Sequence, residues 1–371
     1  MTQKYSKYLN LLLVVTTMSS IVAAPELVPI QNGMSLRAIT AKYYLEGNVY
    51  IGGTTSWEKP SRTSGLLDRE FSYITPENDF KHEMVHPGPG IWNWKYADAW
   101  IKSAAEHGQV IRIHGPISPQ CSTWAKADHR TAAELEKSLY DYMTALCQRY
   151  NGVPQVKWMD VVNETIEARK NVWFGPKKGT DRWENPWTIL GFDESDPLRP
   201  PRYIKMAFEI ANAHAPDIKQ IINQHGSVSP SLWNRIFDLV DYLRGHGLRV
   251  DGIGWQAHVN LGWEKEGTNL KDLEALIERA HANDLSFHVT ENNVWLRKAK
   301  DYEGQAKTFA AILRTLLSKR DSGEVTWNVW NLSDDDSWIE NRHLDGCIFD
   351  YDYAPKPAYY ALREVLLEMK D

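Results

Sequence analysis

The chain has few cysteines and no clustered basic residues, and each shortage excludes a class of protein. Three cysteines, Cys121, Cys147 and Cys347, stand far apart among 371 residues. Their spacing fits no zinc site, and they could form one disulfide at most, without any indication of which two would pair. At least one is expected to be a buried free thiol. Because there is no polybasic run and the net charge is only −6, nucleic acid is not an expected partner.

Long hydrophobic runs are also missing, and the main one lies near the start of the chain. Lys4 and Lys7 precede an apolar stretch at 9–15, which small residues follow. The stretch is too short, and too quickly diluted by threonine and serine, to span a membrane. The pattern is typical of an export signal. We therefore expect a signal peptide at 1–24 and a secreted mature domain at 25–371, extracellular or periplasmic and free of the membrane; a retained anchor is the alternative.

No linker rich in serine or proline, no repeat and no low-complexity segment interrupts the chain, which predicts a single domain. Short β-rich runs alternate with amphipathic segments, such as Thr131–Tyr150 with its apolar stripe at helical spacing. Eight strands with intervening helices favour a closed α/β fold, the (β/α)8 TIM barrel, over an open sheet. The expected strands are 49–53, 73–75, 110–114, 157–163, 220–223, 252–258, 286–290 and 325–330.

Aromatic residues are the compositional anomaly, with 16 Trp and 17 Tyr. Flat aromatic faces stack on sugar rings, although core packing explains more than half of them. A long insert at 168–201 holds Trp173, Trp183 and Trp187 and follows one of the strands directly. A loop of this length usually has a function, so we interpret it as a wall of the substrate cleft rather than a surface excursion.

Two predicted strands end abruptly in a carboxylate, at Glu164 and at Glu291. A glutamate at the tip of a strand lies above the sheet rather than inside it. Hydrolysis of a glycosidic bond needs two such groups, one to protonate the leaving oxygen and one to attack the sugar or stabilise its positive charge. Each glutamate could instead cap the next helix, but the pair together, with Asn163 directly before Glu164, favours catalysis.

Other polar side chains stand at the carboxyl ends of the same strands, where an α/β barrel has its active site. A rim with a purely structural role would not need so many hydrogen-bonding groups. The residues at these ends are Glu77, Asn78, Lys81, His114, Asn163, Glu164, Asn223, His225, Gln256, His258, Glu291 and Trp330.

Five ordered segments carry a resemblance to a known family: Phe71–Lys81, Asp160–Glu164, Gly252–His258, Thr290–Glu291 and Val329–Trp338. They resemble motifs of glycoside hydrolase family 10, the retaining endo-β-1,4-xylanase family, across roughly residues 35–370. The resemblance implies hydrolysis of a β-linked polysaccharide, with no cofactor and no metal. A monomer suffices for this chemistry and is the expected state.

The resemblance also implies a role for each site residue. Glu164 would be general acid and then general base, and Glu291 the nucleophile, with the two carboxyl groups ~5 to 5.5 Å apart. His258 would donate a hydrogen bond that keeps Glu291 ionised, and Asn163 would bind the sugar 2-hydroxyl. The substrate-binding residues implied are Glu77, Asn78, Lys81, His114, Asn163, Asn223, Gln256, His258, Trp330 and Trp338.

Two segments depart from the family pattern. The family usually has Gly-His-Thr-Leu-Val-Trp-His after the third strand, whereas this chain has Ile113-His114-Gly115-Pro116-Ile117-Ser118-Pro119. The tryptophan ring of the family pattern is missing from this segment. Its absence should open space for a substituent or another sugar, unless Trp255 and the insert rebuild that wall of the cleft. Asn293 replaces an Asp, and the loss of that charge should weaken the imidazolium form of His258.

Three other interpretations stay open. A clan relative with the same two carboxylates could act on another polysaccharide. A catalytically inactive barrel that only binds glycan would show the loss of Glu164, Glu291 or Asn163, and all three are present. A metal-dependent hydrolase could use His82, Glu83 and His86, but three such loop residues are more often solvated side chains, so no metal site is predicted.

Overall fold

The computed structural model describes residues 33–63, 65–126, 130–176, 184–297, 299–339 and 344–370. The predicted signal peptide and Trp183 lie outside them. The predicted (β/α)8 barrel is confirmed: parallel strands follow the order β11-β1-β2-β3-β4-β7-β8-β10, and β10 pairs with β11 to close the sheet. The barrel strands are β1 (Val49–Thr55), β2 (Tyr73–Pro76), β3 (Val110–Ile113), β4 (Val156–Asn163), β7 (Lys219–Gln224), β8 (Gly252–Trp255), β10 (Ser286–Trp295) and β11 (Val325–Val329).

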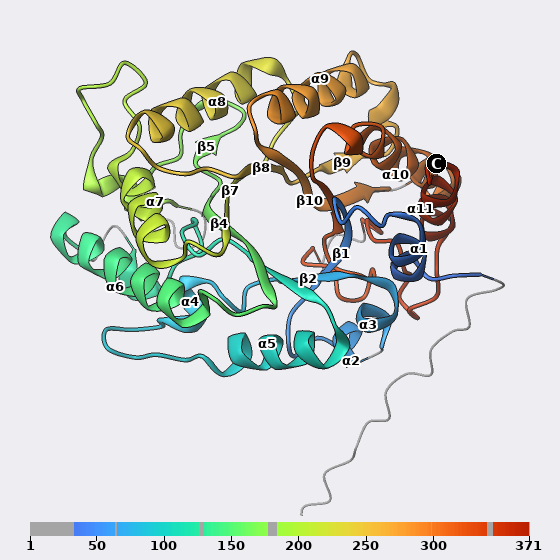
Figure 1. Cartoon of the computed structure of the whole chain (residues 1–371), viewed down its shortest axis with the longest axis horizontal. Helices are drawn as coiled ribbons and strands as arrows, with labels where there is room; N and C mark the ends of the chain where they lie inside the picture. The colour runs from blue at the N-terminus through green and yellow to red at the C-terminus, as the bar shows by residue number, and fades with distance from the viewer. Residues whose placement is uncertain are drawn as a thin grey trace, which may run out of the picture.

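Helices surround this barrel, and Figure 1 shows the longer ones as an outer ring with the strands at the centre. This is the arrangement that strand-helix alternation produces when each crossover helix packs on its own pair of strands. The helices are α1 (Leu36–Tyr43), α2 (Pro60–Thr63), α3 (Leu66–Glu70), α4 (His82–Val85), α5 (Lys95–His107), α6 (Ala132–Tyr150), α7 (Arg202–His214), α8 (Pro230–Gly245), α9 (Asn269–Ala282), α10 (Tyr302–Leu317) and α11 (Pro357–Glu368).

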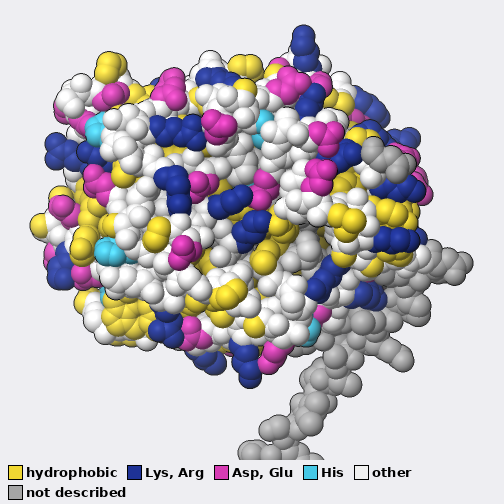
Figure 2. Space-filling model, viewed as in Figure 1, with side chains coloured by type: hydrophobic (Ala, Val, Ile, Leu, Met, Phe, Trp, Pro, Cys, Tyr) yellow, Lys and Arg dark blue, Asp and Glu magenta, His cyan; other side chains and the backbone are white. Residues whose placement is uncertain are grey.

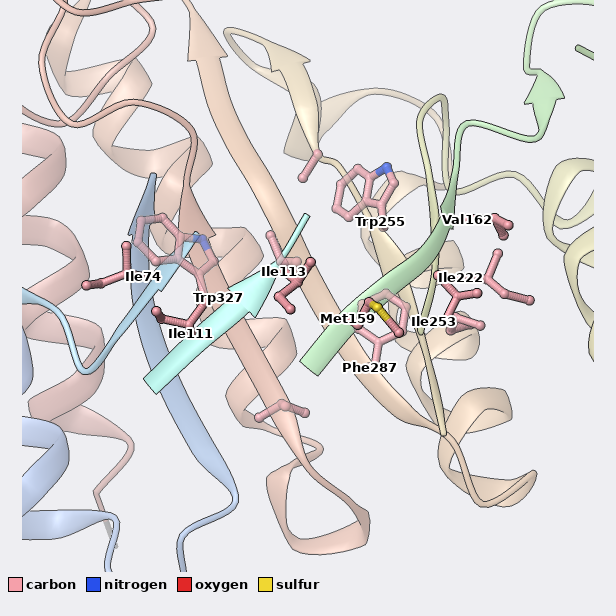
Figure 3. Close-up of a cluster of buried hydrophobic side chains, with 14 of the residues drawn as sticks. Ile74, Ile111, Ile113, Met159, Val162, Ile222, Ile253, Trp255, Phe287 and Trp327 are labelled. Atoms are coloured by element: carbon pink, nitrogen blue, oxygen red, sulfur yellow. The ribbon is translucent and has the colours of Figure 1, made fainter. Parts of the chain in front are cut away.

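The main core lies between the strands and the helices. Figure 3 shows side chains such as Ile111 of β3, Met159 of β4 and Ile253 of β8 in this layer, and all three are buried. Helix α6 shows how the sequence builds the outer part: Thr131 and Glu134 form a capping box at its start, and its predicted apolar stripe is buried. Charges of both signs are interspersed on the face that Figure 2 shows.

The inside of the barrel is more polar than this outer layer. Arg112 on β3 donates from Nε to Asp160 Oδ2 on β4 at 3.1 Å, and both side chains are buried. A buried ion pair needs further hydrogen bonds to offset its desolvation, and His114 supplies one to the same carboxylate. The pair therefore lies directly beneath the rim and holds a histidine of the predicted site.

Several tryptophans belong to the core rather than to a binding surface. Trp187 and Trp255 are fully buried. That Trp255 and the insert rebuild part of the open wall stays a prediction. Trp187 lies in η3 (Pro186–Leu190) and donates through its indole nitrogen to the Ser118 carbonyl. Buried indoles usually find such a partner, so these rings serve packing.

His82 and His86 are also structural, and the expectation of solvated side chains is wrong for both. His82 is buried, its Nδ1 accepts from the Ser122 backbone N–H at 3.0 Å, and its Nε2 lies 3.1 Å from Ser138 Oγ. Burial lowers the pKa of His82 to about 3, so the ring is neutral. Across the described ranges, no three His, Cys, Asp or Glu side chains are close enough to hold a metal ion together.

All three cysteines are buried free thiols. Among the residues that the structure describes, no helix has the length and apolar character needed to cross a membrane.

Candidate active site

A cleft of about 900 Å³ opens at the carboxyl ends of the barrel strands. Every predicted site residue lines it except Asn223, and the two glutamates face it together. We call it the active-site cleft. Its lining is Ser56, Lys59, Glu77, Asn78, Lys81, His114, Gln120, Asn163, Glu164, Glu167, Ala168, Arg169, Phe174, His225, Gly226, Gln256, His258, Glu291, Trp295, Trp330 and Trp338.

Glu164 stands just past the end of β4 in an unusual backbone conformation. Its φ is +58°, a left-handed value that costs energy for a residue with a side chain. The backbone N–H of Glu164 donates to the Asn223 carbonyl at 3.0 Å, and Gln256 Nε2 donates to its Oε1 at 2.8 Å. The strained turn thus aims a mostly buried carboxyl group into the cleft.

Glu291 lies within β10, where one extra residue shifts the pairing with β11 between Val289 and Asn292. Such a bulge re-aims a side chain that would otherwise follow the strand pleat. Asn223 Nδ2 donates to Glu291 Oε1 at 2.8 Å, and His258 Nε2 lies 3.3 Å from Oε2. The bulge therefore points Glu291 at a ready set of hydrogen-bond donors.

The charge state of Glu291 follows from a balance of burial and nearby cations. Burial alone would raise the pKa of this carboxyl group, but His114, His258 and Lys81 outweigh it and lower the pKa to about 2. His114 Nε2 lies 3.9 Å from Glu291 Oε1. Glu291 is consequently ionised at neutral and mildly acidic pH.

A chain of side-chain amides connects the two glutamates. Asn223 Nδ2 donates to Glu291 and also to Asn163 Oδ1 at 2.9 Å, while Gln256 Nε2 donates to Glu164 and lies 3.3 Å from the same Asn163 oxygen. Asn163 takes part in this chain only through Oδ1, which accepts both bonds, so neither hydrogen of its Nδ2 group is used there. In the described part of the chain Nδ2 has no hydrogen-bond partner, and it is available to a ligand in the cleft.

Asn223 corrects one prediction. It was expected to bind substrate, but it is fully buried and does not line the cleft. Both of its amide protons are used by Asn163 and Glu291, and its oxygen accepts from Thr290 Oγ1 at 2.8 Å. Strand β7 turns this side chain inward, below the rim, so Asn223 positions other residues instead of touching a sugar.

The two histidines near Glu291 are each oriented by a hydrogen bond at the ring nitrogen Nδ1. His114 Nδ1 donates to the buried Asp160 carboxylate at 2.9 Å, and His258 Nδ1 lies 3.0 Å from Asn293 Oδ1. Asn293 Nδ2 donates to the Trp330 carbonyl, so its oxygen must face His258. Asn293, where the resemblance implies an Asp, thus orients His258 without supplying a charge.

Lys81 and its neighbours form the β1–β2 end of the cleft. Lys81 is buried and donates to Gln120 Oε1. Burial lowers the pKa of its ammonium group, and Glu291, Glu164 and Glu77 oppose that shift. Lys59 Nζ lies 2.8 Å from Glu77 Oε2. Gln120 was missed because it belongs to the segment after β3 that departs from the family pattern.

Aromatic rings form another side of the cleft. Trp330 packs edge-on against His114 with ring centroids 4.8 Å apart, and Trp338 is 46% exposed and offers a free face. Trp295 was missed: β10 continues past Glu291 and pairs with β9 (His258–Asn260), which stacks Trp295 on His258 at 5.8 Å and 9°. The apolar Val294-Trp295 pair after Glu291 was the available signal.

The insert after β4 begins as a hairpin and not as irregular chain. Strands β5 (Ile166–Glu167) and β6 (Val172–Trp173) pair antiparallel directly after Glu164. Glu167, Ala168, Arg169 and Phe174 of this region line the cleft, so the described part of the insert contributes to its wall. Strands of two residues give no periodic signal, which is why the hairpin was not predicted.

Comparisons with known proteins agree with this geometry. The family model described as glycosyl hydrolase family 10 matches residues 35–365. The chain belongs to this family. It is therefore a glycoside hydrolase, as the sequence predicted.

Individual relatives are distant in sequence but similar in structure. The chain is 25% identical over 341 residues to endo-1,4-beta-xylanase B of Thermotoga neapolitana, covering 86% of this chain and 89% of that protein. It is 28% identical over 301 residues to endo-1,4-beta-xylanase B of Neocallimastix patriciarum, covering 80% of this chain and 32% of that longer protein. The crystal structure of xylanase 10B from Thermotoga petrophila RKU-1 in complex with xylobiose superposes with a TM-score of 0.75 at 26% identity, covering 92% of this chain and 100% of that one.

Proposed function

We propose that this family 10 enzyme cleaves internal β-1,4 linkages of xylan, or of a related β-linked polysaccharide, with retention of configuration. The observation that carries the proposal is the pair Glu164 and Glu291, which face one cleft and are joined through Asn163, Asn223 and Gln256. Retaining hydrolysis needs two carboxyl groups on opposite sides of one bond, one of them ionised.

The reaction would follow two displacements. Glu291 attacks the anomeric carbon while Glu164 gives its proton to the leaving oxygen, which forms a glycosyl-enzyme ester and frees the shortened chain. Glu164, now a carboxylate, takes a proton from water, and that water displaces Glu291 from the sugar. The two free donors on Asn163 Nδ2 would bond to the oxygen of the 2-hydroxyl and hold the sugar in place for both displacements.

The two ends of the cleft suit different parts of the polymer. Lys81, Glu77 and Asn78 would hold the sugars on the non-reducing side, and Trp330 and Trp338 would stack on ring faces. Residues that follow Glu164 in the chain lie beside the proton donor and would hold the leaving-group side. Xylan is the first substrate to test because the relatives above are named as xylanases.

The first experiment is product release from a panel of β-linked polysaccharides, xylans included, with Glu291→Ala as the control. Short β-1,4-xylo-oligosaccharides that disappear in the variant would support a xylanase. If only another polymer yields products, the proposed mechanism stands, and the segment after β3 that departs from the family pattern accounts for the different specificity. If no polymer is cleaved, the proposal fails in favour of a glycan-binding barrel.

The roles of the two glutamates are tested by azide, which can take the place of a missing carboxylate. In Glu291→Ala, azide should attack an activated β-glycoside directly and give the α-glycosyl azide. In Glu164→Ala, the ester still forms on Glu291, and azide should displace it to give the β-glycosyl azide. The opposite pair of anomers would mean that the two roles are reversed.

Secretion is part of the same proposal and rests on the sequence pattern at 1–24. We expect the exported protein to start near residue 25 and to run as a monomer. N-terminal sequencing of the exported protein and light scattering check both points; a retained N-terminus would indicate an anchor.

A further inference from the structure

The leaving-group end of the active-site cleft carries two cationic or ionisable side chains that the proposed mechanism does not use. Arg169 and His225 both line the cleft there. We call these two residues the basic corner. Arg169 is exposed, and His225 is half-buried. Neither is expected to touch the reacting atoms, so the corner needs another explanation.

The corner is held by a rigid framework. Gln224, which is buried, accepts from the Ile166 N–H at 3.1 Å and donates to the Ile166 carbonyl at 2.9 Å, which fixes the start of the hairpin to the tip of β7. The turn of the hairpin is tied from the other side, where Asn171 Nδ2 donates to the Ser231 carbonyl at 3.0 Å. The hairpin therefore presents Arg169 from a fixed base.

A glycine brings the two halves of the corner together. Gly226 has φ +107°, and a Cβ built there would lie 2.5 Å from the Cβ of Ala168. Only a residue without a side chain permits this approach, which holds the start of the turn that carries Arg169 against the loop that carries His225. The close contact shows that the hairpin packs onto the β7 loop and does not merely extend into solvent.

Arg169 is the member of this turn whose charge is not compensated. Its neighbour Lys170 lies 3.1 Å from Glu167, and at the other end of the cleft Lys59 pairs with Glu77 and Lys81 bonds to Gln120. Among the described residues Arg169 makes no ion pair and no hydrogen bond. An arginine presented in this way offers its whole planar fork to a ligand.

We propose that the basic corner recognises a carboxylate on the leaving-group side of the substrate, so that the preferred polymer carries uronic acid residues there. This proposal rests on the proposed function. A guanidinium group matches a planar carboxylate with two parallel hydrogen bonds, which gives direction as well as attraction. Glu167 also lines the cleft and would repel an acidic sugar, so binding that sugar requires a further cation beyond Lys170, which pairs with Glu167.

The test compares one polymer in two charge states. A glucuronic acid-substituted β-1,4-xylan is used as it is and after chemical reduction of its carboxyl groups to alcohols, which removes the charge and keeps the backbone. The wild-type enzyme, Arg169→Ala and Arg169→Lys are assayed for kcat/KM on both forms at low and high salt. Arg199→Ala is the matched control, because it removes an exposed arginine from the same insert, and neither Arg199 nor its partner Glu194 lines the cleft.

We expect the wild type to prefer the acidic polymer by about tenfold, and the preference to be lost in Arg169→Ala and only partly kept in Arg169→Lys. High salt should reduce the preference, because the corner is exposed to solvent. Arg199→Ala should keep the wild-type ratio.

Three results would overturn the inference alone: equal rates on both forms, an unchanged ratio in Arg169→Ala, or the same loss in Arg199→Ala. A wild-type enzyme that cleaves neither form of this xylan would instead count against the proposed function, so the two failures are distinguishable.

Discussion

At the scale of single residues, the role of each side chain in the site depends on which hydrogen-bond partners its polar atoms have. Asn163 and Asn223 look equivalent in the sequence, since each stands at a strand end with amide donors. Their hydrogen bonds differ. The Nδ2 group of Asn163 is available to a ligand, whereas both Nδ2 hydrogens of Asn223 are donated to other side chains. The sequence located both residues at the rim, but the direction of a side chain at a strand tip depends on bulges and neighbours that no periodic pattern records.

This difference gives a first prediction, for Asn223→Ala. The change removes the hydrogen bonds that orient Glu291 and Asn163, so kcat should fall by about 10- to 100-fold while KM changes little. Removing a buried amide should also lower the free energy of unfolding by about 1–3 kcal/mol. Steady-state kinetics and thermal unfolding check both numbers.

Asn78→Ala is the comparison for that variant. Asn78 lines the cleft from its outer end and is only half-buried, so its loss should raise KM more than it lowers kcat. If the two variants gave the same split between kcat and KM, Asn223 would be a substrate contact after all.

A second residue-scale prediction concerns the acid side of the pH profile. In the proposed mechanism Glu291 must be ionised to attack. Its pKa of about 2 results from His114, His258 and Lys81, which together outweigh the effect of burial. His114→Asn removes the first of these cations, so the pKa of Glu291 should rise. The acid limb of kcat/KM should then move to higher pH, by about one unit or more.

A pH–rate series on the wild type and on His114→Asn measures this shift. The alkaline limb should move less, because His114 Nε2 lies 3.9 Å from Glu291 Oε1, whereas the carboxyl group of Glu164 accepts a hydrogen bond from Gln256. If the acid limb does not move, His114 does not lower the pKa of Glu291.

At the scale of elements, the long periodic features were predicted and the short ones were not. All eight barrel strands were found because buried parallel strands read as β-rich apolar runs between amphipathic helices. The hairpin of β5 and β6, and the short β9, were missed because two or three residues carry no period. Such short ribbons are formed by tertiary contacts, yet they supply Arg169 and place Trp295 on His258.

The hairpin contact gives the element-scale prediction, for Gly226→Ala. The new methyl group would lie 2.5 Å from Ala168, so the hairpin must move away from the β7 loop. We expect a loss of about 2–3 kcal/mol in the free energy of unfolding and a higher KM for long substrates. Thermal unfolding and kinetics on oligosaccharides of increasing length would measure both.

Gly247→Ala separates the contact from backbone strain. Gly247 also has a positive φ, +76°, but nothing lies within 4 Å of a Cβ built there. The free energy of unfolding of Gly247→Ala should therefore fall only by the cost of the left-handed conformation, about 1–2 kcal/mol. The variant should keep the wild-type KM. Equal losses in both variants would show that the Gly226–Ala168 approach does not matter.

At the scale of the whole molecule, the site and the fold share one set of charges. The buried Arg112–Asp160 pair fills the barrel beneath the rim and holds His114, and His114 in turn lowers the pKa of Glu291. A catalytic charge that the fold stabilises must also make the fold depend on pH. The enzyme's stability in acid therefore reports on the same network as its catalysis.

The last prediction follows from that linkage. The pKa of Glu291 is lowered from 4.5 to about 2 in the folded chain, so the unfolded chain takes up this proton first as the pH falls. The stabilisation that Glu291 gains is complete above about pH 4.5 and is lost as the pH falls through about 2, in total on the order of 3 kcal/mol. Glu291→Gln has no such proton to take up. Its melting temperature should consequently fall less steeply than that of the wild type over this range, whatever the difference between the two at neutral pH, and parallel curves would mean that Glu291 is not held ionised by the fold.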